Sequence, residues 1–133
     1  MRGINFAITV LLSLLLVQCK STQPVHISYT DQNNNRYTVT ESVLKYDPIT
    51  PAESSSGTFS GGDPLNIKIT KNDFEAITNL AEEILSTESR DNKREMLTSV
   101  LTIKKGAESR TVILKKSKDR MNLEEMLQKL KQK

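Results

Sequence analysis

Cysteine, histidine and tryptophan are almost absent from this chain: its 133 residues include one Cys, one His and no Trp. A single Cys excludes an internal disulfide. A zinc site would have to combine His26 with carboxylates, and a serine nucleophile would have only His26 as an imidazole base. His26 falls on the polar face of a predicted strand, with no acid nearby to orient it. We therefore expect no metal site, no cofactor and no enzymatic activity.

A hydrophobic run long enough to span a bilayer is also absent. The apolar stretch Ile4–Val17 carries no charge and follows Arg2. It is shorter than the roughly 20 residues that cross a hydrocarbon core, but it suits the central region of a signal peptide. We expect residues 1–18 to be a signal peptide that is removed, followed by a short tether over residues 19–24.

The sequence LLLVQC, which ends at Cys19, resembles the lipobox of bacterial lipoproteins, with Leu16 and Val17 in its apolar positions. The resemblance implies that Cys19 becomes the mature N-terminus and carries acyl chains such as palmitate. It thus implies a membrane-anchored protein of the bacterial cell envelope. The following KSTQP lacks an Asp that would suggest inner-membrane retention, so we expect the outer membrane, facing the periplasm. An ordinary secretory signal with an incidental Cys is the alternative.

The rest of the chain, residues 25–133, shows the periodicities of one small α+β domain. Alternating apolar residues predict strands over 25–30, 36–46, 65–69, 96–105 and 110–116, with a bulge near residues 41–43 and a turn over 31–35. Helical periodicity predicts helices over residues 70–85 and about 119–131. Thr70 and Asp73 form a capping-box pattern for the first helix, and Asp119 or Asn122 could cap the second. The predicted order is β-β-loop-β-α-β-β-α: a two-layer domain with both helices on one face of an antiparallel sheet.

The segment over residues 47–64 is rich in Pro, Ser and Gly and cannot form regular structure. Loops of this length in compact domains are usually functional or disordered. We predict a partner-binding loop around one aromatic residue, Phe59, unless that ring folds back into the core. The candidate site residues are Ser55, Ser56, Gly57, Thr58, Phe59, Ser60, Gly61 and Gly62.

Two motif-like stretches fail as active or metal sites. The run from Asp31 to Ser42 begins like a calcium loop, but Arg36 replaces the required Gly and Ser42 the bidentate Glu. SGTFSGG matches neither a nucleophile elbow nor a phosphate loop. The basic residues that accumulate after Lys104 are expected to be solvated surface, with no nucleic-acid partner.

Residues 54–131 are similar in pattern and element order to emfourins, small protein inhibitors of thermolysin-like metallopeptidases. The similarity lies in SSGTFSGG, the helix KNDFEAITNLAEEI, the hairpin LTIKKGAESRTVILKK and the final NLEEMLQKL. It implies a peptidase inhibitor. The hypothesis favoured by the residues themselves is a lipid-anchored, non-catalytic domain that binds a protein or an envelope component. A structural lipoprotein with an unknown partner is a further alternative.

Overall fold

The computed structural model describes residues 23–87 and 93–133, and these form a six-stranded antiparallel sheet with two helices on one face. The predicted α+β two-layer class is confirmed. The predicted signal peptide and Cys19 lie outside the described residues. The strands are β1 (Val25–Thr30), β2 (Arg36–Val39), β3 (Val43–Asp47), β4 (Leu65–Lys68), β5 (Ser99–Lys105) and β6 (Glu108–Leu114). The helices are α2 (Lys71–Thr87) and α3 (Lys118–Lys131).

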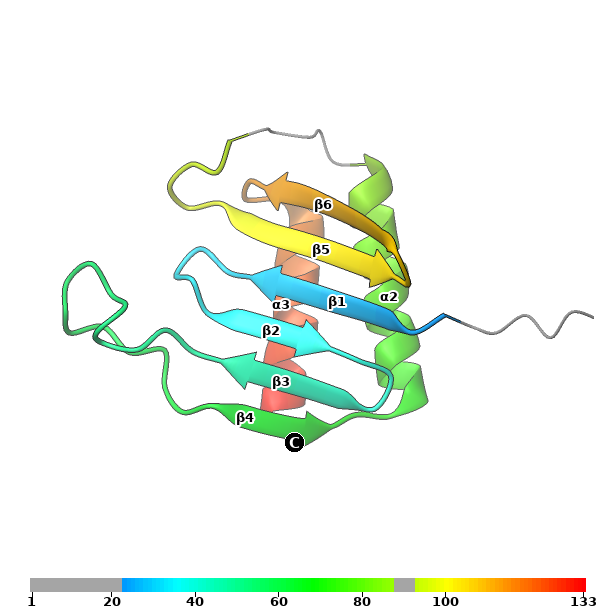
Figure 1. Cartoon of the computed structure of the whole chain (residues 1–133), viewed down its shortest axis with the longest axis horizontal. Coiled ribbons are helices and arrows are strands. Elements are labelled where there is room, and N and C mark those ends of the chain that lie inside the picture. The colour runs from blue at the N-terminus through cyan, green and yellow to red at the C-terminus, as the bar shows by residue number, and fades with distance from the viewer. Residues whose placement is uncertain (1–22, 88–92) are drawn as a thin grey trace, which may run out of the picture.

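The strand order across the sheet is β4-β3-β2-β1-β5-β6 (Figure 1). The first four strands form a meander, and the β5–β6 hairpin adds to the free edge of β1 after the chain has passed through α2. β1 is therefore an interior strand that pairs with β2 on one side and with β5 on the other.

The segment Arg36–Tyr46 was expected to be one strand with a bulge, and this expectation is wrong. It forms two strands, β2 and β3, joined by a tight turn at residues 40–42. The amide of Thr40 donates to the carbonyl oxygen of Val43 at 2.9 Å, and Val39 pairs directly with Leu44. Because that pairing puts Val39 and Leu44 on the same face, the change in apolar phase along the sequence marked a reversal of the chain.

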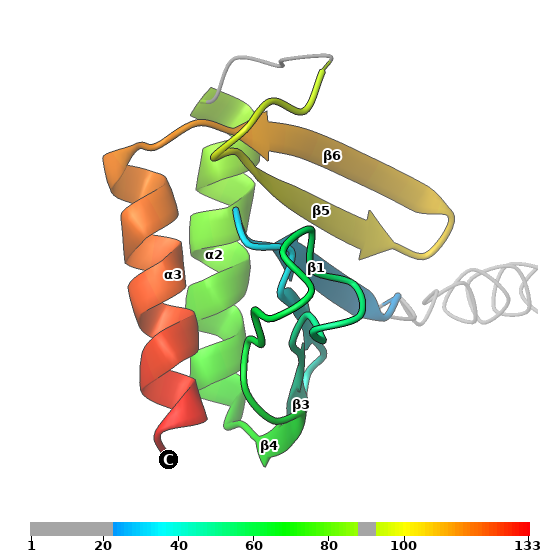
Figure 2. The ribbon, with the colours of Figure 1, turned by 90° about the vertical axis from the view of Figure 1, so that its left-hand side faces the viewer.

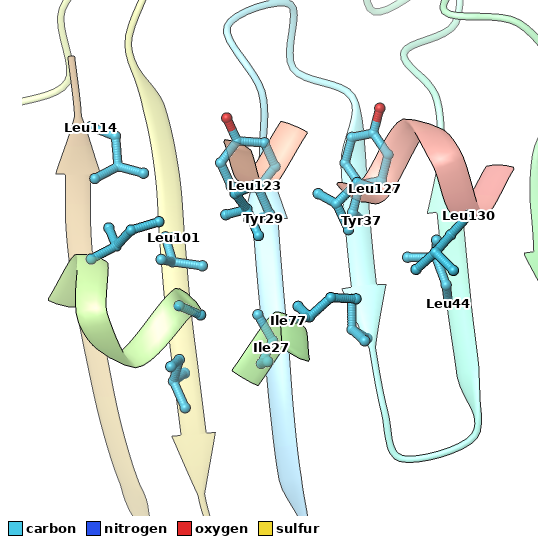
Figure 3. Packing of buried hydrophobic residues seen from close by; sticks show 14 of the residues in the cluster. Ile27, Tyr29, Tyr37, Leu44, Ile77, Leu101, Leu114, Leu123, Leu127 and Leu130 are labelled. Atoms are coloured by element: carbon cyan, nitrogen blue, oxygen red, sulfur yellow. The ribbon is translucent and has the colours of Figure 1, made fainter. Parts of the chain in front are cut away.

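The core lies between the sheet and the helices (Figure 3). Ile27, Leu101 and Ile103 project from the central strands and meet the predicted apolar stripes of the two helices. The buried helical residues are Ile77, Ala81 and Ile84 on α2 and Leu123, Leu127 and Leu130 on α3. Every member of this core lies within residues 27–130, so a chain that starts at residue 20 retains all of it.

The start of α2 follows the predicted capping box. The Thr70 amide donates to Asp73 Oδ2 at 3.0 Å, and the Asp73 amide donates to Thr70 Oγ1 at 3.1 Å. Lys133 Nζ binds the same carboxylate at 2.9 Å and so ties the end of the chain to α2. For α3, Ser117 is the N-cap, so the expected caps Asp119 and Asn122 are wrong.

The helices run across the strands, with α3 behind one half of the sheet and α2 behind the other (Figures 1 and 2). This arrangement gives the domain two different ends. We call the end where β1 begins the tether end. The opposite end carries the turn 31–35, the long loop 48–64, the segment 93–98 and the first turn of α3; we call it the loop end.

Candidate functional site

The loop end begins with the turn after β1. Asp31 Oδ1 accepts hydrogen bonds from the amides of Asn33 at 2.8 Å and Asn35 at 2.9 Å, while Oδ2 accepts from Asn35 Nδ2 at 2.8 Å. Asn34 has a φ of 68°, a left-handed conformation that Asn tolerates well. The Asp31 carboxylate thus holds the turn together.

The long loop has a fixed base that packs on this turn. Ile49 is buried, and its amide donates to Asn35 Oδ1 at 3.1 Å. Gly61 donates from its amide to the Ile49 carbonyl at 3.0 Å and accepts from Tyr46 Oη at 2.7 Å. A Cβ on Gly61 would lie 2.0 Å from Asn35 Oδ1, so only glycine fits there. Gly61, one of the predicted site residues, therefore closes the loop and is not free for a partner.

The outer part of the loop is organised by hydroxyl groups. Ser56 Oγ lies 3.0 Å from Ser54 Oγ and 3.2 Å from Thr58 Oγ1, and it accepts from the amide of Phe59 at 3.3 Å. Gly57 supplies a left-handed position with φ 71°. The Phe59 side chain is 44% exposed. Of the two alternatives for this ring, the structure shows the one in which it does not enter the core.

A buried arginine ties the other loop-end segments together. Arg120 is 3% exposed and lies at the start of α3. Its guanidinium donates from Nε to Glu124 Oε1 at 2.9 Å, from Nη1 to the Leu97 carbonyl at 2.8 Å, and from Nη2 to Gln32 Oε1 at 3.0 Å. Burial opposes the charge of Arg120, but its bonds to Glu124 prevail and raise its pKa. One side chain therefore fixes α3, the turn 31–35 and the segment 93–98 relative to one another.

Leu97 is held in an unusual conformation by this contact. The sequence pattern placed Leu97 inside a strand, which is wrong: β5 begins at Ser99, and Leu97 has a φ of 63° with its side chain 68% exposed. A left-handed backbone is sterically unfavourable for leucine, and exposure of its apolar side chain to water is also unfavourable. Strained residues that their surroundings hold in place cluster at functional sites, so Leu97 is a candidate contact residue.

Three tyrosines on adjacent strands brace the same end of the sheet. Tyr29 Oη donates to Glu124 Oε1 at 2.5 Å, and Tyr37 Oη accepts from Gln128 Nε2 at 3.0 Å. Figure 3 shows the hydroxyls of Tyr29 and Tyr37 pointing toward the turn that joins β1 to β2. Burial raises the pKa of both hydroxyls well above their ordinary value, so each stays protonated at any physiological pH.

The third tyrosine, Tyr46, lies under the end of α3. Lys131 Nζ is 3.5 Å from the centre of its ring, within the range of a cation–π interaction. Burial against the rings lowers the pKa of Lys131. The Tyr46 hydroxyl donates to the base of the long loop, as described above. Sheet, helix and loops therefore form one rigid support at this end.

Two of the cavities at the loop end open on either side of the turn 31–35. The larger, about 530 Å³, lies between this turn and α3, with Leu97 and Met121 in its lining. The smaller, about 350 Å³, lies between the turn and the long loop and includes Phe59. Gln32 and Asn33 line both cavities, so the two hollows form one continuous uneven surface.

Exposed apolar side chains are concentrated here. Among the described residues, the large hydrophobic side chains with high exposure are Phe59 at 44%, Met96 at 91%, Leu97 at 68% and Met121 at 54%. All four lie in loop-end segments: Phe59 in the long loop, Met96 and Leu97 in the segment 93–98, and Met121 in the first turn of α3. Single exposed apolar residues are ordinary, but a group gathered on one surface is typical of an interaction site.

The predicted site and the observed one overlap in part. The structure places Ser55, Ser56, Gly57, Thr58, Phe59, Ser60 and Gly62 on the exposed part of the loop, and Gly62 has a positive φ of 101°. Sequence reasoning missed Arg120 and Leu97. A signal for Arg120 was present, because it precedes Leu123 and Leu127 at the spacing of an apolar helical stripe and so had to face the core.

The described part of the chain holds no group of three His, Cys, Asp or Glu residues placed to bind a metal ion. His26 lies on the exposed face of β1, near the tether end. No helix within residues 23–87 or 93–133 has the length and apolar character needed to cross a membrane. Comparisons with protein-family models, with curated proteins and with solved structures give no match to this chain.

Proposed function

We propose that this chain is a lipid-anchored, non-catalytic domain of the bacterial cell envelope that binds a protein partner through its loop end. One observation carries the proposal: the exposed Phe59, Met96, Leu97 and Met121 all belong to segments of the loop end, opposite the start of β1. An anchor at Cys19 would hold the tether end near the membrane and leave the loop end accessible.

The character of this surface favours a protein partner. Apolar anchors on a fixed frame lose little conformational entropy on binding, because the frame is already ordered. Met and aromatic residues are enriched at protein interfaces. The turn 31–35 adds amide groups between the apolar residues, which suits a mixed polar and apolar contact.

Co-purification of the intact protein from its native membrane tests this proposal. Phe59→Ala and Leu97→Ala should each reduce capture of a partner at least tenfold. Ile113→Thr changes a half-buried apolar residue on the outer face of β6 and should leave capture unchanged. Equal capture by all three variants would remove the loop end as the binding surface.

The anchor is tested separately. Cys19→Ser should abolish incorporation of labelled palmitate and release the protein from the outer-membrane fraction. Retention in the membrane without label would contradict lipidation.

A second candidate function is inhibition of a thermolysin-like metallopeptidase. The observation that favours it is the exposed Leu97, whose carbonyl is bound by Arg120. A peptidase inhibitor needs a contact segment that is held in a fixed conformation in this way. Residues 20–133 should then inhibit such an enzyme stoichiometrically, and Leu97→Ala should weaken inhibition while Ile113→Thr does not. No inhibition at micromolar concentration across a panel of these enzymes would exclude this function.

A further inference from the structure

The sheet face that the helices leave uncovered is regular, polar and basic. We call it the open face; it is the face toward the viewer in Figure 1. Thr38, Ser28, Thr102 and Thr111 lie side by side on it, in register across four neighbouring strands. The hydroxyls of Thr102 and Thr111 are 2.9 Å apart and hydrogen-bonded.

Basic side chains surround this row. Arg36, Lys45, Lys68 and Lys104 alternate with inward-facing core residues on four strands and are all exposed. Among the outward-facing strand residues that the structure describes, Asp47 is the one carboxylate, and it lies 2.9 Å from Lys45 Nζ. Glu53 of the long loop also pairs with Arg36, at 3.5 Å. Four cations therefore face two carboxylates, and the open face carries a net positive charge.

The opposite layer differs in charge. On α2, Lys71 is outnumbered by Asp73, Glu75, Glu82 and Glu83. On α3, acidic and basic residues are nearly balanced, and several form ion pairs such as Lys129 with Glu125 at 2.8 Å. An anionic surface would therefore attract the open face and not the helices.

The spacing of the cations indicates the size of the ligand. Neighbouring strands are about 4.8 Å apart, so Lys68 on β4 and Lys104 on β5 are separated by about 19 Å across the sheet. No single phosphate can bridge that distance. Lysines spread this way, with hydroxyl donors between them, suit an extended array of phosphate groups.

We infer that the open face rests on a bilayer surface rich in anionic phospholipid headgroups. The choice of a membrane rests on the proposed anchor: Cys19 lies six residues before Val25, so the tether spans at most about 20 Å. A lipid anchor combined with a basic surface binds membranes more stably than either one alone. Contact through the open face leaves the loop end free at the side for a partner.

Vesicle binding tests this inference with residues 20–133, which lack Cys19 but contain the whole core. The wild-type fragment should sediment with phosphatidylglycerol vesicles at low salt, and not with phosphatidylcholine vesicles or in 0.5 M NaCl. Each lysine near an anionic bilayer is worth about fivefold in affinity. Combining Lys45→Glu, Lys68→Glu and Lys104→Glu should therefore weaken binding by about a hundredfold or more.

A matched variant controls for total charge. Lys71→Glu, Lys118→Glu and Lys129→Glu together change the net charge equally, but on exposed positions of the helical layer. This variant should bind vesicles within about threefold of wild type. An equal loss in both triple variants would show that net charge alone acts and would overturn the assignment of the open face. Circular dichroism and thermal unfolding verify that both variants are folded.

Orientation gives an independent measurement. The fragment contains no Cys, so Ser28→Cys on the open face or Asn79→Cys on α2 can each carry a single environment-sensitive fluorophore. Only the probe at residue 28 should shift to the blue with phosphatidylglycerol vesicles. Absent vesicle binding, or tighter binding to nucleic acid or a phosphorylated polysaccharide, would overturn the membrane assignment. Since Phe59→Ala should not alter vesicle binding, failure here is distinct from failure of the proposed partner site.

Discussion

The ion pair between Arg120 and Glu124 predicts that replacing Glu124 destabilises the fold more than replacing Arg120. The Arg120 side chain is 4% exposed, whereas that of Glu124 is 34% exposed. Glu124→Gln keeps an oxygen to accept from Tyr29 and Arg120, but it leaves a buried guanidinium without its counter-charge. Loss of one member of a buried pair costs about 3–5 kcal/mol. Because water reaches Glu124 and screens the pair, we expect a loss of about 2–3 kcal/mol.

Removal of the arginine should cost less. Arg120→Met places an apolar chain in the helical stripe and leaves Glu124 partly hydrated and still bound by Tyr29. The carbonyl oxygen of Leu97 and the side-chain oxygen of Gln32 lose their donor, but both lie at the exposed loop end, where water can replace it. We expect a loss of about 1–2 kcal/mol. Combining the two substitutions should cost no more than Arg120→Met alone, which gives a coupling free energy of about 2–3 kcal/mol, the cost of Glu124→Gln by itself.

Urea unfolding of residues 20–133, followed by circular dichroism, measures these differences as shifts in midpoint at constant m-value. In thermal unfolding, Glu124→Gln should lower Tm by roughly 10 °C. Glu125→Gln is the matched control: it is the same chemical change one residue along the helix, at an exposed pair with Lys129, and should leave the midpoint unchanged. A larger loss for Arg120→Met than for Glu124→Gln would refute the asymmetry argued from burial.

Three further outcomes follow from individual contacts. Hydrogen bonds from Lys133 and from Thr70 lower the pKa of Asp73 to about 2. The stability that the ionised Asp73 contributes is therefore complete above its unfolded pKa near 4 and is lost as pH falls toward 2. In Asp73→Asn, the urea midpoint should depend less on pH over that range. Leu97→Gly should raise the free energy of unfolding by about 0.5–1 kcal/mol, because glycine adopts a positive φ without strain. The same variant should capture less partner, and a loss of stability would show that Leu97 is not strained. Gly61→Ala should destabilise the fold by about 1–3 kcal/mol, measured by the same urea titration, because Asn35 Oδ1 occupies the space of the new methyl group; unchanged stability would contradict this packing.

Much of this fold follows from local sequence patterns. The capping box at Thr70, the apolar stripes of α2 and α3, and the hairpin of β5 and β6 each depend on residues close together in the chain, and each is confirmed. The reversal at residues 40–42 was missed because Thr-Glu-Ser contains no Gly, Pro, Asn or Asp, the strongest turn residues. Only the change of apolar phase marked it, and that change is equally compatible with a bulge.

The candidate site could be predicted only where composition alone marks it, as in the Ser- and Gly-rich loop around Phe59. The position of Leu97 depends on a hydrogen bond from Arg120, which lies far along the chain. Alternation with Ser99 and Leu101 predicted a strand there, and the tertiary contact overrides it. The charge of the open face was equally hidden, because its cations come from strands separated in the sequence by the long loop and α2.

The interior position of β1 has a consequence for how the protein forms. Synthesis begins at the N-terminus, so β1 to β4 emerge as a meander while the β1 edge that β5 will occupy stays unpaired. Unpaired edges of incomplete sheets invite pairing with other chains. The contacts of β1 with β5 join distant parts of the chain, and such contacts slow folding. The incomplete meander is therefore the species that we expect a chaperone to protect, until the β5–β6 hairpin closes the sheet.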